Sequence, residues 1–274
     1  MSDNNQLQKE LAKKALNIRR NVVTMIYNAS SGHPGGALSL TDILTVLYFK
    51  EMKVDPQNPK KEERDRFVLS KGHASAALYA TLAEKGFFSK DELIKFRKLE
   101  SMLQGHPEMK YIPGVDMSTG SLGQGLSAAN GMAIAGKLDG KDYRVYCVVG
   151  DGEIEEGQIW EAAMSSAKYK LDNLCVIVDN NNLQIDGTVE NVMSPYPIDK
   201  KFEDFGFNVI NIDGHDFNQI INAFEEAKKV KGKPTAIVAK TIKGRGVSYM
   251  ENQAGWHGKA PNEEQFNLAM QDLR

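Results

Sequence analysis

The hydrophobic positions of this chain follow two different periods. In some segments apolar residues recur every three to four positions, which is typical of helices with one buried face. Between them lie short apolar runs bounded by Gly, Asn or Asp, which are typical of buried strands. The predicted helices are 6–29, 40–50, 74–84, 89–99, 127–138, 160–167, 218–230 and 262–273. The predicted strands are 66–70, 143–149, 173–180, 207–213 and 234–241.

The order of these elements indicates the fold class. Strands alternate with helices along most of the chain, which predicts an α/β fold with a mostly parallel sheet and helices on both faces. Neither a repeat nor a low-complexity tract nor a linker interrupts the pattern, so we predict one domain over residues 1–274. The carboxyl ends of parallel strands meet at one edge of a sheet, where such folds bind ligands.

Local signals refine three of the predicted helices. The Gly- and Pro-containing run 30–36 predicts a turn that ends the first helix. Ser89 with Glu92 three residues later predicts a capping box at the start of helix 89–99. In the sixth helix, the residues at the spacing of one helix face, which we predict to be buried, are Trp160, Ala163, Met164 and Ala167.

Composition and charge narrow the class of protein. The 274 residues are 41% hydrophobic and 26% charged, with a net charge of −2, so electrostatics favour neither nucleic acid nor an anionic membrane as a partner. The sequence contains neither a signal-peptide-like h-region nor an apolar run of about 18 residues, and we expect a cytoplasmic protein that does not enter the membrane. Cys147 and Cys175 lie in apolar runs, where we expect reduced buried thiols rather than a disulfide or a metal pair.

The stretch 143–187 carries the strongest chemical signal, because two predicted strands and a helix form a βαβ unit with polar loops. Asp151 follows the first strand between Gly150 and Gly152, which allow a bulky group close to the backbone. The next helix offers free amides that favour a phosphate. Asn residues 180–182 close the second strand. These oxygens predict half of a Mg²⁺ site, which phosphate oxygens, a backbone carbonyl and water would complete.

A Gly-Asp-Gly turn alone is a weak signal, but its context makes it specific. Asp151 and Asn181 are 30 residues apart, and this spacing resembles the signature of thiamine diphosphate enzymes. More narrowly, the chain resembles the N-terminal, diphosphate-binding half of a transketolase over nearly its whole length. The motifs that carry the resemblance are SGHPGG (31–36), DRFVLSKGHA (65–74), GHPE (105–108), STGSLGQGLS (118–127), GDGEIEEGQIWEA (150–162), DNNNLQIDG (179–187) and WHGKAP (256–261).

The resemblance implies a thiamin diphosphate-binding fold and a set of residues that hold the cofactor. The implied metal ligands are Asp151, Asn181 and the carbonyl of Leu183, with Mg²⁺ or another divalent cation such as Ca²⁺ or Mn²⁺. The implied cofactor contacts are Gly120, Gly152 and His257 at the diphosphate and Leu122 at the thiazolium ring. Lys243 is a further candidate, because its positive charge suits the diphosphate.

Histidines dominate the implied catalytic set. The resemblance places four of the five near the reactive carbon of the cofactor, namely His33, His73, His106 and His257. Imidazole titrates near neutrality and therefore suits reversible proton transfer to the hydroxyls of a ketose. The fifth, His215, lies in Asp-Gly-His-Asp and is predicted to be a turn or helix-start residue.

Glu156 and Glu161 follow the metal loop on the predicted helix. The resemblance assigns both to the cofactor-binding set and to an acidic network that joins the two active sites of a thiamine-dependent dimer, with Glu156 also acting in catalysis. The alternative is that both are solvated acids near a helix N-terminus, where negative charge is favoured.

The function that the resemblance implies is transfer of a two-carbon ketol unit from a ketose (phosphate) to an aldose (phosphate). The resemblance covers only the diphosphate domain, so we expect a second transketolase subunit with the pyrimidine-binding and C-terminal domains, in an α2β2 heterotetramer. Two alternatives stay open. The chain could be part of another thiamine diphosphate enzyme, of the deoxyxylulose-phosphate synthase or 2-oxoacid decarboxylase type, or a non-catalytic thiamine diphosphate-binding module.

Overall fold

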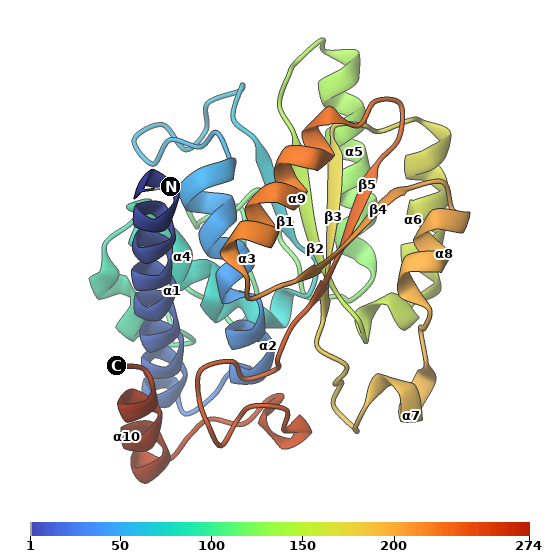
Figure 1. The fold of residues 1–274 in the computed structure, drawn as a ribbon. Helices are drawn as coiled ribbons and strands as arrows, with labels where there is room; N and C mark the ends of the chain where they lie inside the picture. The colour runs from blue at the N-terminus through green and yellow to red at the C-terminus, as the bar shows by residue number, and fades with distance from the viewer. Residues whose placement is uncertain (1) are drawn as a thin grey trace.

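The computed structural model describes residues 2–274, with side chains from residue 5 onward. Within this range the chain forms one five-stranded sheet in which all neighbouring strands are parallel, in the order β1-β2-β3-β5-β4 (Figure 1). The strands are β1 (Arg66–Leu69), β2 (Val145–Gly150), β3 (Leu174–Asn180), β4 (Asn208–Asp213) and β5 (Thr235–Lys240). The sheet confirms the predicted fold class and all five predicted strands.

Helices cover both faces of the sheet. The α-helices are α1 (Ser2–Ala29), α2 (Pro34–Ser39), α3 (Thr41–Val46), α4 (Ser75–Lys85), α5 (Gln124–Leu138), α6 (Gly157–Lys168), α7 (Val189–Met193), α8 (Ile198–Asp204), α9 (Phe217–Lys229) and α10 (Glu263–Asp272). Short 3₁₀ turns span Gly72–Ala74, Lys90–Lys95, Glu153–Glu155 and Ala254–Trp256, and a π-helical turn spans Leu47–Glu51. No helix of the described residues has both the length and the apolar character needed to cross a bilayer.

Two hydrophobic cores lie on opposite faces of the sheet, because successive strand residues point to opposite sides. Tyr146 of β2 belongs to the larger core, with α1, α3, α4 and α9, whereas Val145 belongs to the smaller core, with α5, α6 and α8. Cys175 and Cys147 divide in the same way, and both are buried free thiols. The two cysteines are therefore packing residues on opposite faces of the sheet.

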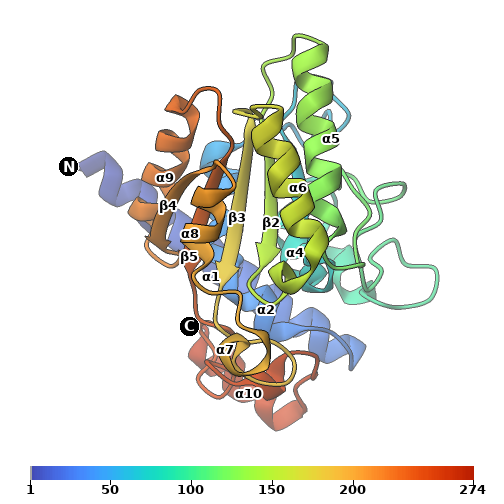
Figure 2. The same cartoon turned by 90° about the vertical axis from the view of Figure 1, so that its right-hand side faces the viewer.

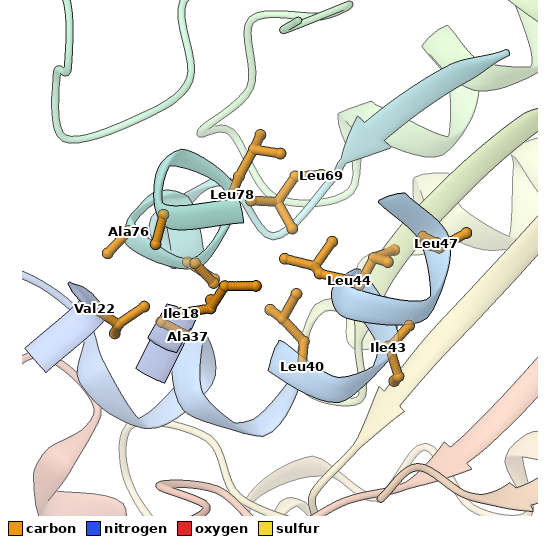
Figure 3. Close-up of a cluster of buried hydrophobic side chains, with 14 of the residues drawn as sticks. Ile18, Val22, Ala37, Leu40, Ile43, Leu44, Leu47, Leu69, Ala76 and Leu78 are labelled. Carbon is orange, nitrogen blue, oxygen red and sulfur yellow. The ribbon is translucent and has the colours of Figure 1, made fainter. Parts of the chain in front are cut away.

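The larger core joins the N-terminal helices to the first strand (Figure 3). Ile18 of α1, Leu44 of α3, Leu69 of β1 and Leu78 of α4 all belong to it and are almost completely buried. Burial of each such side chain contributes on the order of 1.5–3 kcal/mol. This packing fixes the loops that follow α1 and β1, and both loops reach the carboxyl edge of the sheet.

The predicted inner face of α6 is partly wrong. Met164 is 61% exposed, and the buried residues of the helix are Ile159, Ala162, Ala163 and Ser166. Trp160 packs against the rings of Phe202 and Phe205, which lie in and directly after α8. The ring of Trp160 packs on the flank of α6, and the helix face predicted from Trp160 is therefore displaced from the face that is buried.

Two helix boundaries also differ from the prediction. Residues 89–99 form only the 3₁₀ turn Lys90–Lys95, and Ser89 Oγ accepts from the backbone N–H of Asp91 rather than closing a capping box with Glu92. The Glu92 side chain instead contacts Lys95 Nζ at 2.7 Å. The predicted turn 30–36 contains the start of α2, because Pro34 occupies the first helical turn, where its missing N–H costs nothing.

The carboxyl ends of β2 and β3 point toward the end of the molecule where α2, α7 and α10 lie (Figure 2). Gly150 at the end of β2 pairs with Asp179 of β3, and Asn180 pairs with Lys240 of β5. The three adjacent strand ends therefore bring the loops 151–156, 181–187 and 241–246 to one edge.

Candidate active site

A cavity of about 620 Å³ lies at this edge of the sheet. The sequence-predicted residues among those that line it are His33, His73, Gly120, Leu122, Asp151, Gly152, Glu156, Asn181, Leu183, Lys243 and His257. The structure thus brings together residues from motifs that are up to about 220 positions apart in the chain. His106 and Glu161 do not line the cavity.

The predicted metal ligands lie at the ends of β2 and β3. Asp151 is 2% exposed, and its carboxylate accepts the backbone N–H groups of Gly152 at 2.9 Å and of Asn182. Asn181 Oδ1 accepts the N–H of Leu183 at 3.1 Å. The carbonyl of Leu183 accepts a hydrogen bond from Lys243 Nζ at 3.0 Å. One carboxylate, one amide oxygen and one carbonyl oxygen are hard donors of the kind that Mg²⁺ and Ca²⁺ accept.

Among the described side chains none forms an ion pair with the carboxylate of Asp151, although the charge of Lys71 acts on it from nearby. Burial and the neighbouring carboxylate of Asp179 raise the pKa of Asp151 to about 7. No group of three or more His, Cys, Asp or Glu residues that could hold a metal forms among residues 2–274. A divalent cation here would therefore need the amide and carbonyl oxygens, together with ligands from a bound molecule. The donor set fits a hard cation that is shared with a diphosphate.

Asp179 lies next to this site but is fully compensated. It is 0% exposed and forms an ion pair with Lys71 Nζ at 2.5 Å, and it also accepts from the hydroxyls of Ser39 and Thr241. Burial alone would raise the pKa of Asp179, but Lys71 and the two hydroxyls hold it below its usual value. Lys71 also donates to the carbonyl of Gly36 at 3.0 Å. Sequence reasoning missed this pair, because its members belong to different motifs.

Lys71 and Lys243 place two buried ammonium groups at the cavity wall. Lys243 Nζ lies 3.0 Å from both the Leu183 carbonyl and His257 Nδ1. Burial and the positive charge of Lys71 lower the pKa of Lys243 to about 8. Lys71 is already paired with Asp179, so Lys243 is the ammonium group whose charge an anion in the cavity, such as a diphosphate, would stabilise.

Three of the four predicted histidines form a cluster. The ring centroids of His33, His73 and His257 lie 5.1 to 5.4 Å apart. Burial, Arg97 and His106 lower the pKa of His33 to about 4, and burial and Lys243 lower that of His257 to about 3. Burial and Lys71 likewise lower the pKa of His73 well below its usual value. All three imidazoles are therefore neutral at pH 7 and can both accept and donate hydrogen bonds.

His106 lies beside the cavity, behind Gly120. Gly120 has φ +153°, and a Cβ there would come within 3.0 Å of the His106 ring, so the close approach of the two segments requires glycine. The side chain of Arg97 lies next to His33. Its Nη1 donates to Ser31 Oγ at 3.0 Å, and its Nη2 lies 3.3 Å from His33 Nδ1. Arg97 lies in none of the recognised motifs, so the sequence carried no signal for it.

The side chain of Glu153 links two of the glycine loops by hydrogen bonds. Its buried carboxylate accepts the N–H groups of Gly123 and Gly150, each at 3.0 Å, and the hydroxyl of Ser70 at 2.5 Å. Burial raises the pKa of Glu153 despite these bonds. One side chain therefore ties the end of β1, the loop before α5 and the turn that holds Asp151.

The two acidic residues on α6 are placed differently. Glu156 is the N-cap residue and lines the mouth of the cavity with its side chain exposed. Glu161 lies further along the helix, exposed and away from the cavity. The roles of both residues stay predictions.

Comparisons with known proteins agree with this geometry. Residues 11–273 match the family model "Transketolase, thiamine diphosphate binding domain". The chain is 45% identical over 255 residues to one of the subunits of apulose-4-phosphate transketolase from Phocaeicola vulgatus, covering 93% of this chain and 90% of that one. It is 44% identical over 266 residues to 6-deoxy-6-sulfo-D-fructose transketolase subunit SqwG of Clostridium sp., covering 97% of each.

Longer proteins match over only part of their length. A transketolase from Homo sapiens is 46% identical over 248 residues, which is 89% of this chain but 39% of the human protein. The crystal structure of transketolase from Campylobacter jejuni superposes with a TM-score of 0.91 at 39% identity, over 96% of this chain and 42% of that chain. The match thus corresponds to one part of those proteins and to almost all of the two bacterial subunits above.

Proposed function

This chain belongs to the transketolase family, as an N-terminal subunit that carries the thiamine diphosphate-binding domain, and we propose that it supplies the diphosphate half of a two-chain active site. The assembled enzyme would transfer a two-carbon ketol unit from a ketose to an aldose. The observation that carries the proposal is the convergence of hard oxygen donors, two buried ammonium groups and three neutral imidazoles in one cavity.

Asp151, Asn181 and the Leu183 carbonyl would hold Mg²⁺, and Lys243, whose ammonium contacts that same carbonyl, would add positive charge for the diphosphate. When bound, thiamine diphosphate supplies the carbon nucleophile that such a transfer needs. Leu122 is 39% exposed at the cavity, where an apolar side chain can support an aromatic ring. The protein would thus neutralise charge, position the cofactor and handle protons.

The histidine cluster would bind the hydroxyls of the sugar and move protons between them and the carbonyl oxygen. Lys243 donates to Nδ1 of His257, so Nε2 of that ring carries its proton and is available as a donor. His33 and His73 lie beside the same ring and are neutral. Because a neutral imidazole has one N–H donor and one acceptor nitrogen, these rings can hydrogen-bond sugar hydroxyls and pass a proton from one to another, although their pKa values lie below the near-neutral range expected from the sequence.

A second chain would supply the remainder of the site, because two relatives that match this chain over 90% or more of their length are named as transketolase subunits. We propose that this partner carries the pyrimidine-binding and C-terminal domains and that two copies of each chain form an α2β2 assembly in the cytoplasm. Glu156 at the mouth of the cavity would face the second copy. Alone, the chain would bind cofactor without turnover.

The substrates would be ketoses and aldoses, with a terminal anionic group on at least one of them. The names of two relatives support this proposal, because one acts on a sugar phosphate and the other on a sulfonated sugar. Arg97 beside His33 would add positive charge near the substrate side of the cavity.

The test is an assay of two-carbon transfer with the purified chain, each candidate partner, thiamine diphosphate and Mg²⁺. We expect turnover only with both chains present, and none when Asp151→Ala replaces the wild type. The matched control is Asp142→Ala, an exposed aspartate at the opposite end of β2, which should leave the rate unchanged. Tight cofactor binding without transfer in any combination would favour a non-catalytic binding module instead.

A further inference from the structure

We propose that His215 is a positioning residue for Lys243, acting through the backbone of Ile242. The inference rests on the proposed function only for the role of Lys243 at the diphosphate. It assigns a role to a buried imidazole that the sequence presents as a turn residue between β4 and α9.

Both ring nitrogens of His215 are engaged. Nδ1 lies 2.8 Å from Oδ2 of Asp42, and Nε2 accepts the backbone N–H of Ile242 at 2.8 Å. An ionised carboxylate can only accept, and an N–H can only donate, so the ring is a neutral imidazole with its proton on Nδ1. The two bonds fix both the tautomer and the orientation of the ring.

Asp42 is itself held in place. Arg19 donates to both of its oxygens, at 2.9 and 2.7 Å, in a buried bidentate pair. Although burial raises the pKa of Asp42, Arg19 and His215 hold it below its usual value, so the carboxylate stays charged. Arg19 Nε also donates to the carbonyl of Arg245 at 3.1 Å. The network therefore forms hydrogen bonds to Ile242 and Arg245, and Lys243 lies between these two residues.

The side chains of Thr241 and Lys243 are buried, but the segment runs between two hollows. The cofactor cavity lies on the side of Lys243, and a second hollow of about 570 Å³ lies beside Thr241, Ile242 and Arg245. His215 lines the second hollow and supplies the bond next to Lys243.

The position of Lys243 is sensitive to small shifts. Its Nζ bonds both the Leu183 carbonyl and His257 Nδ1 at 3.0 Å, and a displacement of about 1 Å would take at least one of these contacts out of hydrogen-bonding range. Two other bonds keep the loop folded without His215, because Gly244 N–H donates to Gly35 and Asn252 N–H donates to Lys243. Loss of His215 should therefore displace Lys243 without unfolding the chain.

The experiment compares His215→Leu with His215→Gln in the full chain. Leucine removes both bonds, whereas the glutamine amide offers one donor and one acceptor at a spacing close to that of the two ring nitrogens. We expect hydrogen exchange at the Ile242 amide to be at least about tenfold faster with leucine and within about threefold of wild type with glutamine. Affinity for thiamine diphosphate with Mg²⁺, measured by calorimetry, should fall about tenfold with leucine and recover with glutamine.

A double-mutant cycle with Lys243→Met tests whether the effect passes through Lys243. We expect His215→Leu to change cofactor affinity less than about twofold once Lys243 is absent. Ile220→Val, a buried change on α9, is the control for general destabilisation and should leave affinity unchanged. Wild-type affinity in His215→Leu, additive losses in the cycle, or a ¹⁵N spectrum with the proton on Nε2 would each overturn the inference. Failure of the wild type itself to bind cofactor would instead contradict the proposed function, and the exchange data would still decide whether His215 holds the loop.

Discussion

Asp151 and Asp179 are two buried carboxylates at the ends of neighbouring strands, yet their surroundings differ. Asp179 has the ammonium of Lys71 and two hydroxyl donors, and its pKa is lowered. Within the described part of the chain Asp151 accepts only backbone N–H groups and forms no ion pair, and its pKa is raised to about 7. The chain thus neutralises one charge internally and leaves the other without a contacting cation, which supports the proposed metal site. Burial alone does not mark a carboxylate as a candidate metal ligand, whereas burial without an ion pair does.

The largest effect is expected when the compensated carboxylate is removed. Asp179→Asn leaves Lys71 buried without a counter-charge, so we expect the free energy of unfolding to fall by about 3–5 kcal/mol. Urea unfolding followed by circular dichroism measures this change. The control Asp139→Asn, at an exposed site after α5, should change it by less than about 0.5 kcal/mol. A loss of less than about 1 kcal/mol for Asp179→Asn would mean that the ion pair does not stabilise the fold.

A smaller effect, of a different kind, is expected at Asp151. Asp151→Asn keeps the shape but removes the charge, and we expect Mg²⁺-dependent affinity for thiamine diphosphate to fall about 100-fold, or about 2.7 kcal/mol. Isothermal titration calorimetry measures it. The stability of the metal-free variant should not decrease, because the substitution removes an uncompensated buried charge. Unchanged affinity would show that the metal site lies elsewhere.

The pH dependence of stability should separate the same two residues. The raised pKa of Asp151 means that the folded chain binds more protons than the unfolded chain between about pH 4 and 7. The contribution of Asp151 to stability therefore falls as the pH rises through this window, by on the order of 2–4 kcal/mol without metal. Asp151→Asn should remove that slope in unfolding curves measured from about pH 4 to 8. An identical slope in wild type and variant would exclude a raised pKa.

The histidine cluster should give the smallest effect, with the opposite sign. The pKa of His33 is lowered to about 4, so the unfolded chain binds more protons than the folded chain between about pH 4 and 6.5. Its contribution to stability rises with pH through this window and is lost on acidification. His33→Asn should make the unfolding free energy less sensitive to pH there than in wild type. A steeper dependence in the variant would contradict the neutral state of the ring.

Much of this fold could be predicted from local sequence signals. Four of the five strands are apolar runs, whereas β4 at the sheet edge contains Asn208 and Asn211 and is only partly buried, and each strand appears within one or two residues of its predicted position. The errors arose where a local pattern had two interpretations. Met164 has the spacing of a buried helix face but points to solvent from α6. Pro34 begins α2, although proline next to glycine predicted a turn there. Helices α7 and α8 are too short to show a clear period.

The residues of the candidate site likewise include some that local sequence signals indicated and some that they did not. Several predicted site residues from the recognised motifs, such as Asp151 and His257, lie at one cavity, and their roles stay predictions. Lys71 with Asp179 and His215 with Asp42 could not be found, because each pair joins segments more than 100 residues apart. Such pairs depend on tertiary packing, which no local pattern records. The sequence therefore indicated the groups that face a ligand better than the groups that hold them.

The strand order also determines when the chain can complete its site. β1 pairs with β2, whose partner residues lie 79 positions later, and all neighbouring strands are parallel, so few contacts of the sheet are local. Such topologies fold slowly, because long loops must close before pairing stabilises them. The imidazoles of His33, His73 and His257 meet only after β5 has joined the sheet. During synthesis the cavity therefore forms late, because every residue up to His257 must leave the ribosome before the cavity can bind a ligand.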